Sequence, residues 1–199
     1  MNNKIVVILL MIALIFGCNT KNKDNNIDLI TQQKIKTAFD DWAAKEIEKG
    51  TFFAQDSCYP SYYDTKDSLG LESVFGFAIP WDSSEINIYY ADLNADSIKD
   101  ALITFTPYQC DGGNAAMWVQ YQILVLSQED KYVVIDNYFD RFYNESILGY
   151  GFFHLDSADT KAVFGTYFNF MDNDSRCCPS TQRPIKIDIE KNEFKYLDK

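Results

Sequence analysis

Histidine and basic side chains are scarce in this chain of 199 residues. His154 is the only histidine, and 18 Lys and Arg residues stand against 29 Asp and Glu residues, for a formal net charge of −11 at pH 7. Binding to nucleic acid depends on neutralising phosphates with Lys and Arg, so this balance argues against a nucleic-acid partner. It also argues against adhesion to anionic lipid headgroups by charge alone. Cation binding remains compatible with it.

Signatures of nucleophilic enzymes are missing as well. The sequence has no G-x-S-x-G stretch and no reactive-cysteine context to go with His154, so we expect that histidine to lie half-buried on a strand. Acids are abundant, and a hydrolase with paired carboxylates is an alternative. Glycosidases place two such acids roughly 5–10 Å apart. The candidate pairs are Asp172 with Asp174, and Glu145 with Asp140.

The apolar run at the N-terminus is too short to cross a bilayer. It extends without interruption from Ile5 to Phe16 and follows Lys4, whereas a spanning helix needs roughly 20 residues. Its length suits the apolar region of a signal peptide. An ordinary cleaved signal peptide and a short buried helix are the alternatives to the lipoprotein signal that the next residues suggest.

The residues that end this run carry a specific resemblance. The stretch "IFGC" resembles the lipobox of bacterial lipoproteins, with an aliphatic Ile15, a small Gly17 and Cys18 as the lipidated residue. The resemblance implies that Cys18 becomes the mature N-terminus and carries several acyl chains, which anchor a protein stably where one chain is marginal. It implies a cell-envelope lipoprotein of an uncharacterised family. Asn19, where inner-membrane lipoproteins can carry Asp, favours the outer membrane, on its periplasmic or surface face.

This resemblance divides the chain into three parts. Residues 1–17 are the expected lipoprotein signal peptide, residues 18–28 a flexible tether and residues 29–199 a single domain. The tether is mostly Asn, Lys and Asp and has almost nothing to bury. The remaining length is normal for one domain with its own core.

The remaining cysteines suggest disulfides, because the chain is expected to be exported. They are Cys58, Cys110, Cys177 and Cys178, and three connectivities are possible among them. A bridge between Cys177 and Cys178 would strain the peptide that joins them, so we expect Cys58 and Cys110 each to bond one of that pair. A zinc site is the alternative, although no C-x-x-C pair is present and only one histidine could assist.

One long amphipathic helix is predicted over residues 30–50. Apolar residues recur along one of its faces at helical spacing. They are Ile35, Phe39, Trp42, Ala43 and Ile47. Thr31 is the expected N-cap, with Ile30 and Ile35 as a hydrophobic staple, and Gly50 is the expected C-terminal stop.

Strands are predicted after the helix, in short β-branched and aromatic runs that Gly, Pro, Asp, Asn or Ser interrupt. The runs are "TFFAQ", "LESVFGFAI", "EINIYYA", "DALITFTP", "MWVQYQILVLS", "KYVVIDNYF", "KAVFGTYFNF", "PIKIDIE" and "EFKYL". The sequence offers no second long helix for parallel crossovers. We therefore expect an α+β fold: one N-terminal helix packed on a curved, mostly antiparallel sheet of seven to nine strands.

Acidic residues and Asn alternate in "ADLNADSIKDALITF", residues 91–105. Asp92, Asn94, Asp96 and Asp100 take positions 1, 3, 5 and 9, and Ile98 takes position 7, where a backbone carbonyl can serve as ligand. Calcium binds six to eight oxygens at about 2.3–2.6 Å. The pattern resembles the calcium-binding hairpin loops of FG-GAP-type repeats, and the resemblance implies calcium held by these five residues.

The same loop also suits a turn without metal. Asp and Asn side chains hydrogen-bond their own backbone in turns, and Ser97 stands where such calcium loops usually have Gly. The spacing does not fit an EF-hand, because Ile103 holds position 12, where that loop needs Glu. With or without calcium, we expect the loop mainly to fix the hairpin between two central strands.

A possible binding surface lies in "CYPSYYD", where Tyr59, Tyr62 and Tyr63 occupy an apparent loop. Exposed tyrosines suit sugar stacking or a protein interface, although these could instead fold back onto the core. The expected function is that of a lipid-anchored, non-catalytic binding or interaction module whose partner is an envelope protein or a glycan. The alternatives are an envelope hydrolase using paired carboxylates, with calcium as a possible support, and an inhibitor or immunity-type protein.

Overall fold

The fold is that of a computed structural model, which describes residues 27–58, 76–110, 120–143, 151–175 and 178–198. Within these residues the chain forms one α-helix, three short 3-10 helices and ten strands. In chain order they are α2 (Leu29–Glu48), η1 (Gln55–Ser57), β1 (Phe77–Ala78), η2 (Ser83–Glu85), β2 (Asn87–Ala91), β3 (Asp100–Phe105), β4 (Tyr108–Gln109), β5 (Tyr121–Gln128), β6 (Lys131–Ile135), η3 (Tyr138–Phe142), β7 (Phe152–Asp159), β8 (Ala162–Asn169), β9 (Thr181–Asp188) and β10 (Glu193–Tyr196).

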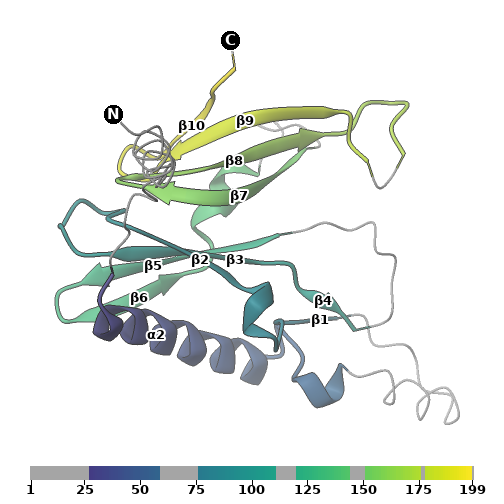
Figure 1. The fold of residues 1–199 in the computed structure, drawn as a ribbon. Helices are drawn as coiled ribbons and strands as arrows, with labels where there is room; N and C mark the ends of the chain where they lie inside the picture. The colour runs from purple at the N-terminus through teal and green to yellow at the C-terminus, as the bar shows by residue number, and fades with distance from the viewer. Residues whose placement is uncertain (1–26, 59–75, 111–119, 144–150, 176–177, 199) are drawn as a thin grey trace, which may run out of the picture.

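The elements stack in three layers (Figure 1). Helix α2 covers one face of a first sheet with strand order β2-β3-β5-β6, and a second sheet with order β10-β9-β8-β7 lies over the other face. A short ribbon pairs β1 with β4. Every strand pair is antiparallel.

The α+β class is confirmed, but the expectation of a single curved sheet of seven to nine strands is wrong. The described strands form two stacked sheets and a separate ribbon. The reason lies in β3 and β5, whose side chains are buried on both faces. A strand that is apolar on both faces needs a covering layer on each side, and a single helix can cover only one of them.

Alternation along the central strands separates two cores. Ala101, Ile103 and Phe105 of β3 pack toward α2, whereas Leu102 packs toward the second sheet. Strand β5 divides in the same way, because successive side chains on a strand point to opposite faces. The core between the sheets is completed by residues of the second sheet and of η3, among them Phe139, Phe153, Leu155, Val163, Ile185 and Ile187.

Helix α2 follows the prediction closely, with three differences at its ends. Asp28, not Thr31, is the N-cap, and its carboxylate accepts a hydrogen bond from the Thr31 N–H at 2.9 Å. Of the expected apolar face, Ile47 is 37% exposed, and Glu46 is buried in that turn instead. Ile30, expected to help staple the first turn, is 71% exposed. Lys49 stabilises the Glu46 carboxylate with a hydrogen bond of 2.5 Å.

Gly50 ends the helix as predicted. Its φ of 79° lies in the left-handed region, which glycine adopts without steric cost. The N–H of Gly50 donates to the carbonyl of Ile47, and the N–H of Thr51 donates to that of Glu46. These two bonds form a Schellman motif, which turns the chain toward the ribbon.

Two glutamines, Gln122 of β5 and Gln120 just before it, join the sheets by bonding the free edge of β7. The Gln120 side chain donates to the Leu155 carbonyl at 3.0 Å and accepts from the Leu155 N–H at 2.7 Å. Gln122, which is buried, donates to the Phe153 carbonyl at 2.8 Å and accepts from the Tyr143 hydroxyl at 3.2 Å. Because β7 is the last strand of its sheet, these amides supply partners that a neighbouring strand would otherwise supply.

Gln122→Leu is expected to destabilise the protein by about 1–3 kcal/mol, because it removes the amide donor at 2.8 Å and leaves the buried Phe153 carbonyl only the Tyr143 hydroxyl at 3.4 Å. Urea-induced unfolding measures the change. The matched control is Gln182→Leu on an exposed position of β9, which should change stability by less than about 0.5 kcal/mol. Equal effects of the two substitutions would show that the amide does not tie the sheets together.

Candidate functional site

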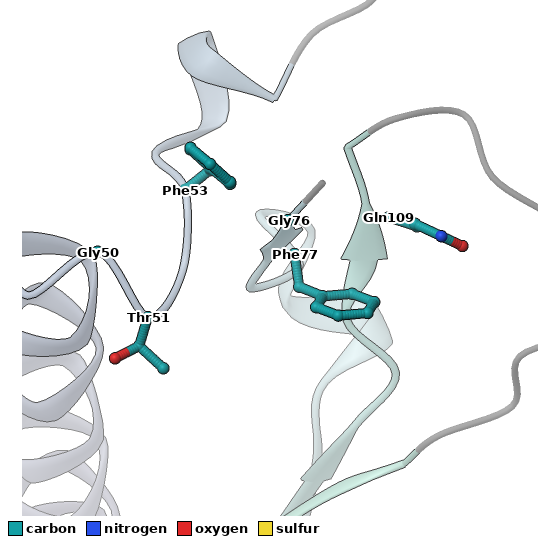
Figure 2. A pocket seen from close by; sticks show the side chains of 6 residues that line it. All are labelled: Gly50, Thr51, Phe53, Gly76, Phe77 and Gln109. Atoms are coloured by element: carbon teal, nitrogen blue, oxygen red, sulfur yellow. The ribbon is translucent and has the colours of Figure 1, made fainter. Parts of the chain in front are cut away.

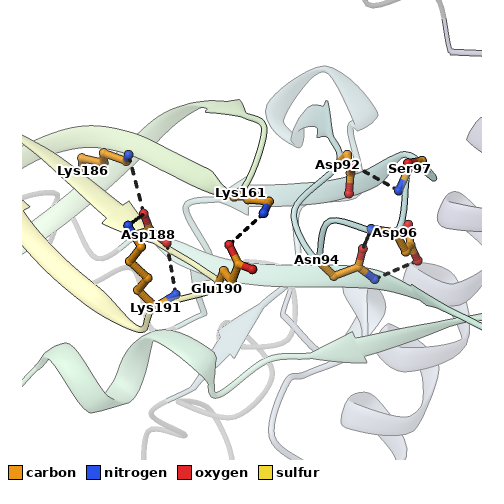
Figure 3. Close-up of polar contacts among 9 residues, drawn as sticks. All are labelled: Asp92, Asn94, Asp96, Ser97, Lys161, Lys186, Asp188, Glu190 and Lys191. Atoms are coloured by element: carbon orange, nitrogen blue, oxygen red, sulfur yellow. Dashed lines mark hydrogen bonds and ion pairs between the residues drawn. The ribbon is translucent and has the colours of Figure 1, made fainter.

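The acidic loop joins β2 to β3 and is organised by its own side chains (Figure 3). The Asn94 side-chain oxygen accepts from the Asp96 N–H at 3.1 Å, and Asp96 Oδ1 accepts from the Ile98 N–H at 2.7 Å. Asp92 Oδ2 accepts from the Ser97 N–H at 3.1 Å. The first two are turns of the Asx kind, so the alternation of Asp and Asn has a structural role.

Two residues of the loop adopt the left-handed conformation. Ala95 has a φ of 65° and Ser97 a φ of 70°, and for residues other than glycine this region costs roughly 1–2 kcal/mol. Ser97, at the position where calcium loops of this kind usually have Gly, therefore adopts the conformation that glycine would adopt freely. The hydrogen bonds above, together with those of Asp100, hold the loop in this shape.

Asp100 is the buried centre of this network. Its side chain is fully buried, and its Oδ2 accepts from the N–H groups of Leu93 and Asn94 at 2.7 and 3.1 Å. Its Oδ1 accepts from the Ser127 N–H and hydroxyl, both at 2.7 Å. Burial raises the pKa of Asp100, and these hydrogen bonds act against that rise. Because donors engage both oxygens, Asp100 ties the loop to β5.

Ser127 also bridges Asp100 and Asp96. Its hydroxyl oxygen lies 2.6 Å from Asp96 Oδ2, so a single hydroxyl hydrogen serves two carboxylates. Burial opposes ionisation of Asp96, but hydrogen bonds from Ser127, Ile98 and Asn94 outweigh it and lower the pKa of Asp96. Asn94 adds a bond from its amide to the Ser127 carbonyl at 2.8 Å.

The backbone of the loop contacts the second sheet. The Asp92 carbonyl accepts from the Lys161 N–H at 2.8 Å, and the Lys161 carbonyl accepts from the Ile189 N–H at 2.8 Å. The side chain of Lys161 pairs with Glu190 at 2.9 Å (Figure 3). The loop therefore lies where the two sheets meet at one end.

The loop meets the requirements of a calcium site in part. Among the described residues, no three His, Cys, Asp or Glu side chains gather closely enough to hold a metal ion. Asp92 Oδ1 is nevertheless buried without a hydrogen-bond partner, as expected of an oxygen that could take a cation. The Ile98 side chain is 43% exposed. Calcium binding therefore stays a prediction. Both oxygens of Asp100 already accept hydrogen bonds, so Asp100 would bind the ion only if some of those bonds were broken.

Cys58 and Cys110 form a disulfide with each other. The expectation that each of them bonds Cys177 or Cys178 is therefore wrong. Their Cα atoms lie 4.7 Å apart. The Phe53 N–H donates to the Phe77 carbonyl and the Cys110 N–H donates to the Gly76 carbonyl, so the segment before η1 and the end of β4 are both held at the ribbon. Cys178 is also disulfide-bonded, and its partner lies outside the described residues.

A shallow pocket of about 300 Å³ lies beside this disulfide, between the end of α2 and the ribbon. It is lined by Gly50, Thr51, Phe53, Gly76, Phe77 and Gln109 (Figure 2). The Phe53 ring packs directly on the backbone of Gly76, where an added Cβ would fall 1.7 Å from the ring. Position 76 therefore requires glycine for this packing.

Two large aromatic side chains are exposed at the ribbon, and one of them, Phe77, lines the pocket. Trp81 is 46% exposed and Phe77 is 42% exposed. The Trp81 ring lies 4.3 Å from that of Tyr108, between centroids. The Tyr108 hydroxyl donates to Glu85, and this bond raises the pKa of Tyr108 to about 12. Phe77 is paired with Gln109 across the ribbon and Ala78 with Tyr108, so Phe77 and Gln109 lie on one face and Tyr108, with Trp81 against its ring, on the other. We name Phe77, Trp81, Tyr108 and Gln109, which together cover both faces of the ribbon, the ribbon surface.

Sequence reasoning missed the ribbon surface. The available signal was that Trp81 ends the apolar run "FAIPW" and is followed directly by the polar stretch "DSSE", since a tryptophan at such a boundary can face water. The three tyrosines that were predicted instead, Tyr59, Tyr62 and Tyr63, lie outside the described residues. Cys18 and Cys177 lie outside them too.

The described residues considered for catalysis each have a local setting in the fold. His154 lies half-buried on β7, with its ring 5.3 Å from Phe152 and 5.2 Å from Phe168. Asp174 organises its own loop by accepting from the Met171 N–H at 2.7 Å and the Ser180 N–H at 2.8 Å. Asp172 is exposed, Asp140 belongs to η3 and Glu145 lies outside the described residues.

Compared with known proteins, the chain matches no protein-family model, no curated protein and no solved structure. Along the described residues, no helix combines the length and the apolar character needed to cross a bilayer.

If the acidic loop binds calcium, the ion should raise the melting temperature by several degrees relative to EGTA, because a ligand at 100 times its Kd stabilises by about 2.7 kcal/mol. Asp96→Ala should abolish the difference, and Asp130→Ala, which removes an exposed carboxylate from the next turn, should preserve it. Identical wild-type melting in calcium and EGTA would exclude a stabilising calcium ion.

Proposed function

We propose that the protein is a lipid-anchored, non-catalytic binding module of the bacterial cell envelope, and that it holds an envelope protein or a glycan at the ribbon surface. The observation that carries the binding site is the exposure of Phe77, which lines the pocket, and of Trp81 on the other face of the ribbon, which the Cys58–Cys110 disulfide braces. The anchor rests on the "IFGC" stretch and Cys18.

The exposed rings favour binding for an energetic reason. Large apolar side chains in water forgo about 25 cal/mol for each Å² that burial would remove from solvent, and aromatic residues are enriched at interfaces and among their energetic centres. Trp81 is held by its contact with Tyr108, so little side-chain freedom remains to be lost on binding. Pre-organisation of this kind lowers the entropic cost of association.

The pocket lies at the opposite end of α2 from the predicted anchor. Gly50 and Thr51, which directly follow the helix, line the pocket, whereas the tether leads into Leu29. A helix rises about 1.5 Å per residue, so the 20 residues of α2 separate the two ends by about 30 Å. This separation would hold the ribbon surface away from the membrane, where a partner can reach it.

The binding site is tested by pull-down of the lipidated protein from its own envelope, with proteins and peptidoglycan fragments identified separately. Trp81→Ala and Phe77→Ala should each lower recovery of the specific partner about tenfold or more, the effect of losing an energetic centre. Met171→Ala is the matched control, because Met171 is 56% exposed and lies outside the ribbon surface. Unchanged recovery with both aromatic variants would refute the assignment of the ribbon surface.

The anchor is tested by the fate of Cys18→Ala. The wild-type chain should float with membranes and incorporate labelled palmitate, and its processing should be sensitive to globomycin. Cys18→Ala should lose all three properties, whereas Asn19→Ala should keep them. A Cys18→Ala chain that is processed and floats as the wild type does would exclude lipidation at this residue.

A further inference from the structure

The first turn of α2 exposes two neighbouring aliphatic side chains. Leu29 is 80% exposed and Ile30 is 71% exposed, although Ile27 before them and Ile35 after them are buried. They are the most exposed large apolar residues among those described. A soluble helix usually turns such residues toward its core, so their position calls for an apolar environment outside the domain.

A third exposed aliphatic residue lies at the same end of the molecule. Ile98, 43% exposed, belongs to the acidic loop. Tyr132 links this loop to the helix, because its ring packs against the core that α2 covers and its hydroxyl donates to the Lys99 carbonyl at 2.9 Å. Figure 1 shows the start of α2, the β2–β3 loop and the β5–β6 turn side by side. We name Leu29, Ile30 and Ile98 the anchor-end surface.

The length of the tether restricts what this surface can meet. Eleven residue steps separate Cys18 from Leu29, and at 3.3–3.6 Å each they span at most about 40 Å. A flexible chain of this length has a root-mean-square span of only about 20 Å. If Cys18 is lipidated, the anchor-end surface therefore stays close to the bilayer at high effective concentration, and a weak affinity for lipid suffices to hold it there.

The surrounding charges indicate the kind of lipid surface. Lys34 lies one helical turn after Ile30, Lys99 directly follows Ile98, and Lys131 follows the β5–β6 turn. Carboxylates of the helix start and of the two turns balance them: Asp28, Asp96, Glu129 and Asp130. A surface with this balance gains nothing from anionic headgroups. Its attraction to a membrane comes from the apolar side chains, which insert at the boundary between headgroups and acyl chains.

We propose that the anchor-end surface rests on the bilayer that holds the lipid anchor, with Leu29 and Ile30 inserted into the interface of a zwitterionic membrane. The proposal rests on the anchor of the proposed function. Its consequence is a fixed orientation: α2 points away from the membrane, and the ribbon surface faces outward about 30 Å beyond it. The chain is therefore held by two contacts, one covalent lipid and one apolar patch.

Tryptophan scanning in vesicles tests this orientation. The lipidated chain carrying Leu29→Trp or Ile30→Trp is placed in phosphatidylcholine vesicles, with or without brominated acyl chains, and its emission is compared with that of the wild type. The emission that the introduced tryptophan adds to that of the wild type should fall by at least half in vesicles with brominated acyl chains. Ile47→Trp, at the far end of the same helix and 37% exposed, is the matched control and should be unaffected. Adding anionic lipid should leave the quenching unchanged.

Quenching that is absent at Leu29→Trp, or equal at Leu29→Trp and Ile47→Trp, would overturn the proposal. A blue shift of the Leu29→Trp emission that grows with protein concentration in the absence of vesicles would also overturn it, because it would assign the surface to a second copy of the chain. Failure of the anchor is a separate result, seen as a wild-type chain that does not float with vesicles. In that case an N-terminal histidine tag on nickel-chelating lipid replaces the anchor, and the same comparison decides the orientation.

Discussion

Burial of β3 and β5 on both faces is the constraint from which the architecture follows. These strands alternate apolar residues for α2 with apolar residues for the second sheet, so neither face can be left to water. Two covering layers are then required. The backbone N–H and C=O groups on the edge strand β7 of the second sheet also need hydrogen-bond partners where that sheet meets the first. Gln120 and Gln122 supply such partners by bonding the backbone of β7. These two amides thus have defined partners on β7, and they set how the sheets align.

The acidic loop extends the same principle to the end of the stack. Asp100 engages the loop backbone and Ser127, and the Asp92 carbonyl reaches the turn between β7 and β8. A buried carboxylate is tolerated only when donors surround it, and here the donors come from two elements that must stay together. The loop contributes to stability through the hydrogen bonds that Asp100 makes with the loop backbone and with Ser127. A bound calcium ion would add to a structure that these bonds already define.

The proposed function and the proposed orientation describe one molecule with two ends. Leu29 and Ile30 lie at the start of α2, and the pocket that Gly50 and Thr51 help to line lies just beyond its end. In these two proposals the helix acts as a rigid spacer between a membrane contact and a binding surface. The disulfide Cys58–Cys110 braces the second of these, where a short ribbon has little core of its own.

The sequence by itself determined the elements: the helix with its glycine stop at Gly50, most of the strands, the turn chemistry of Asp92, Asn94 and Asp96, and the α+β class. These depend on neighbours in the chain, whose spacing is visible in the residues. Only the tertiary structure decided that the strands form two stacked sheets, that Gln122 bonds β7, that Cys58 pairs with Cys110 and that Trp81 is left exposed. Each of these depends on groups far apart in the chain that meet only when the layers pack, and local periodicity carries no information about which distant surface will cover a given face.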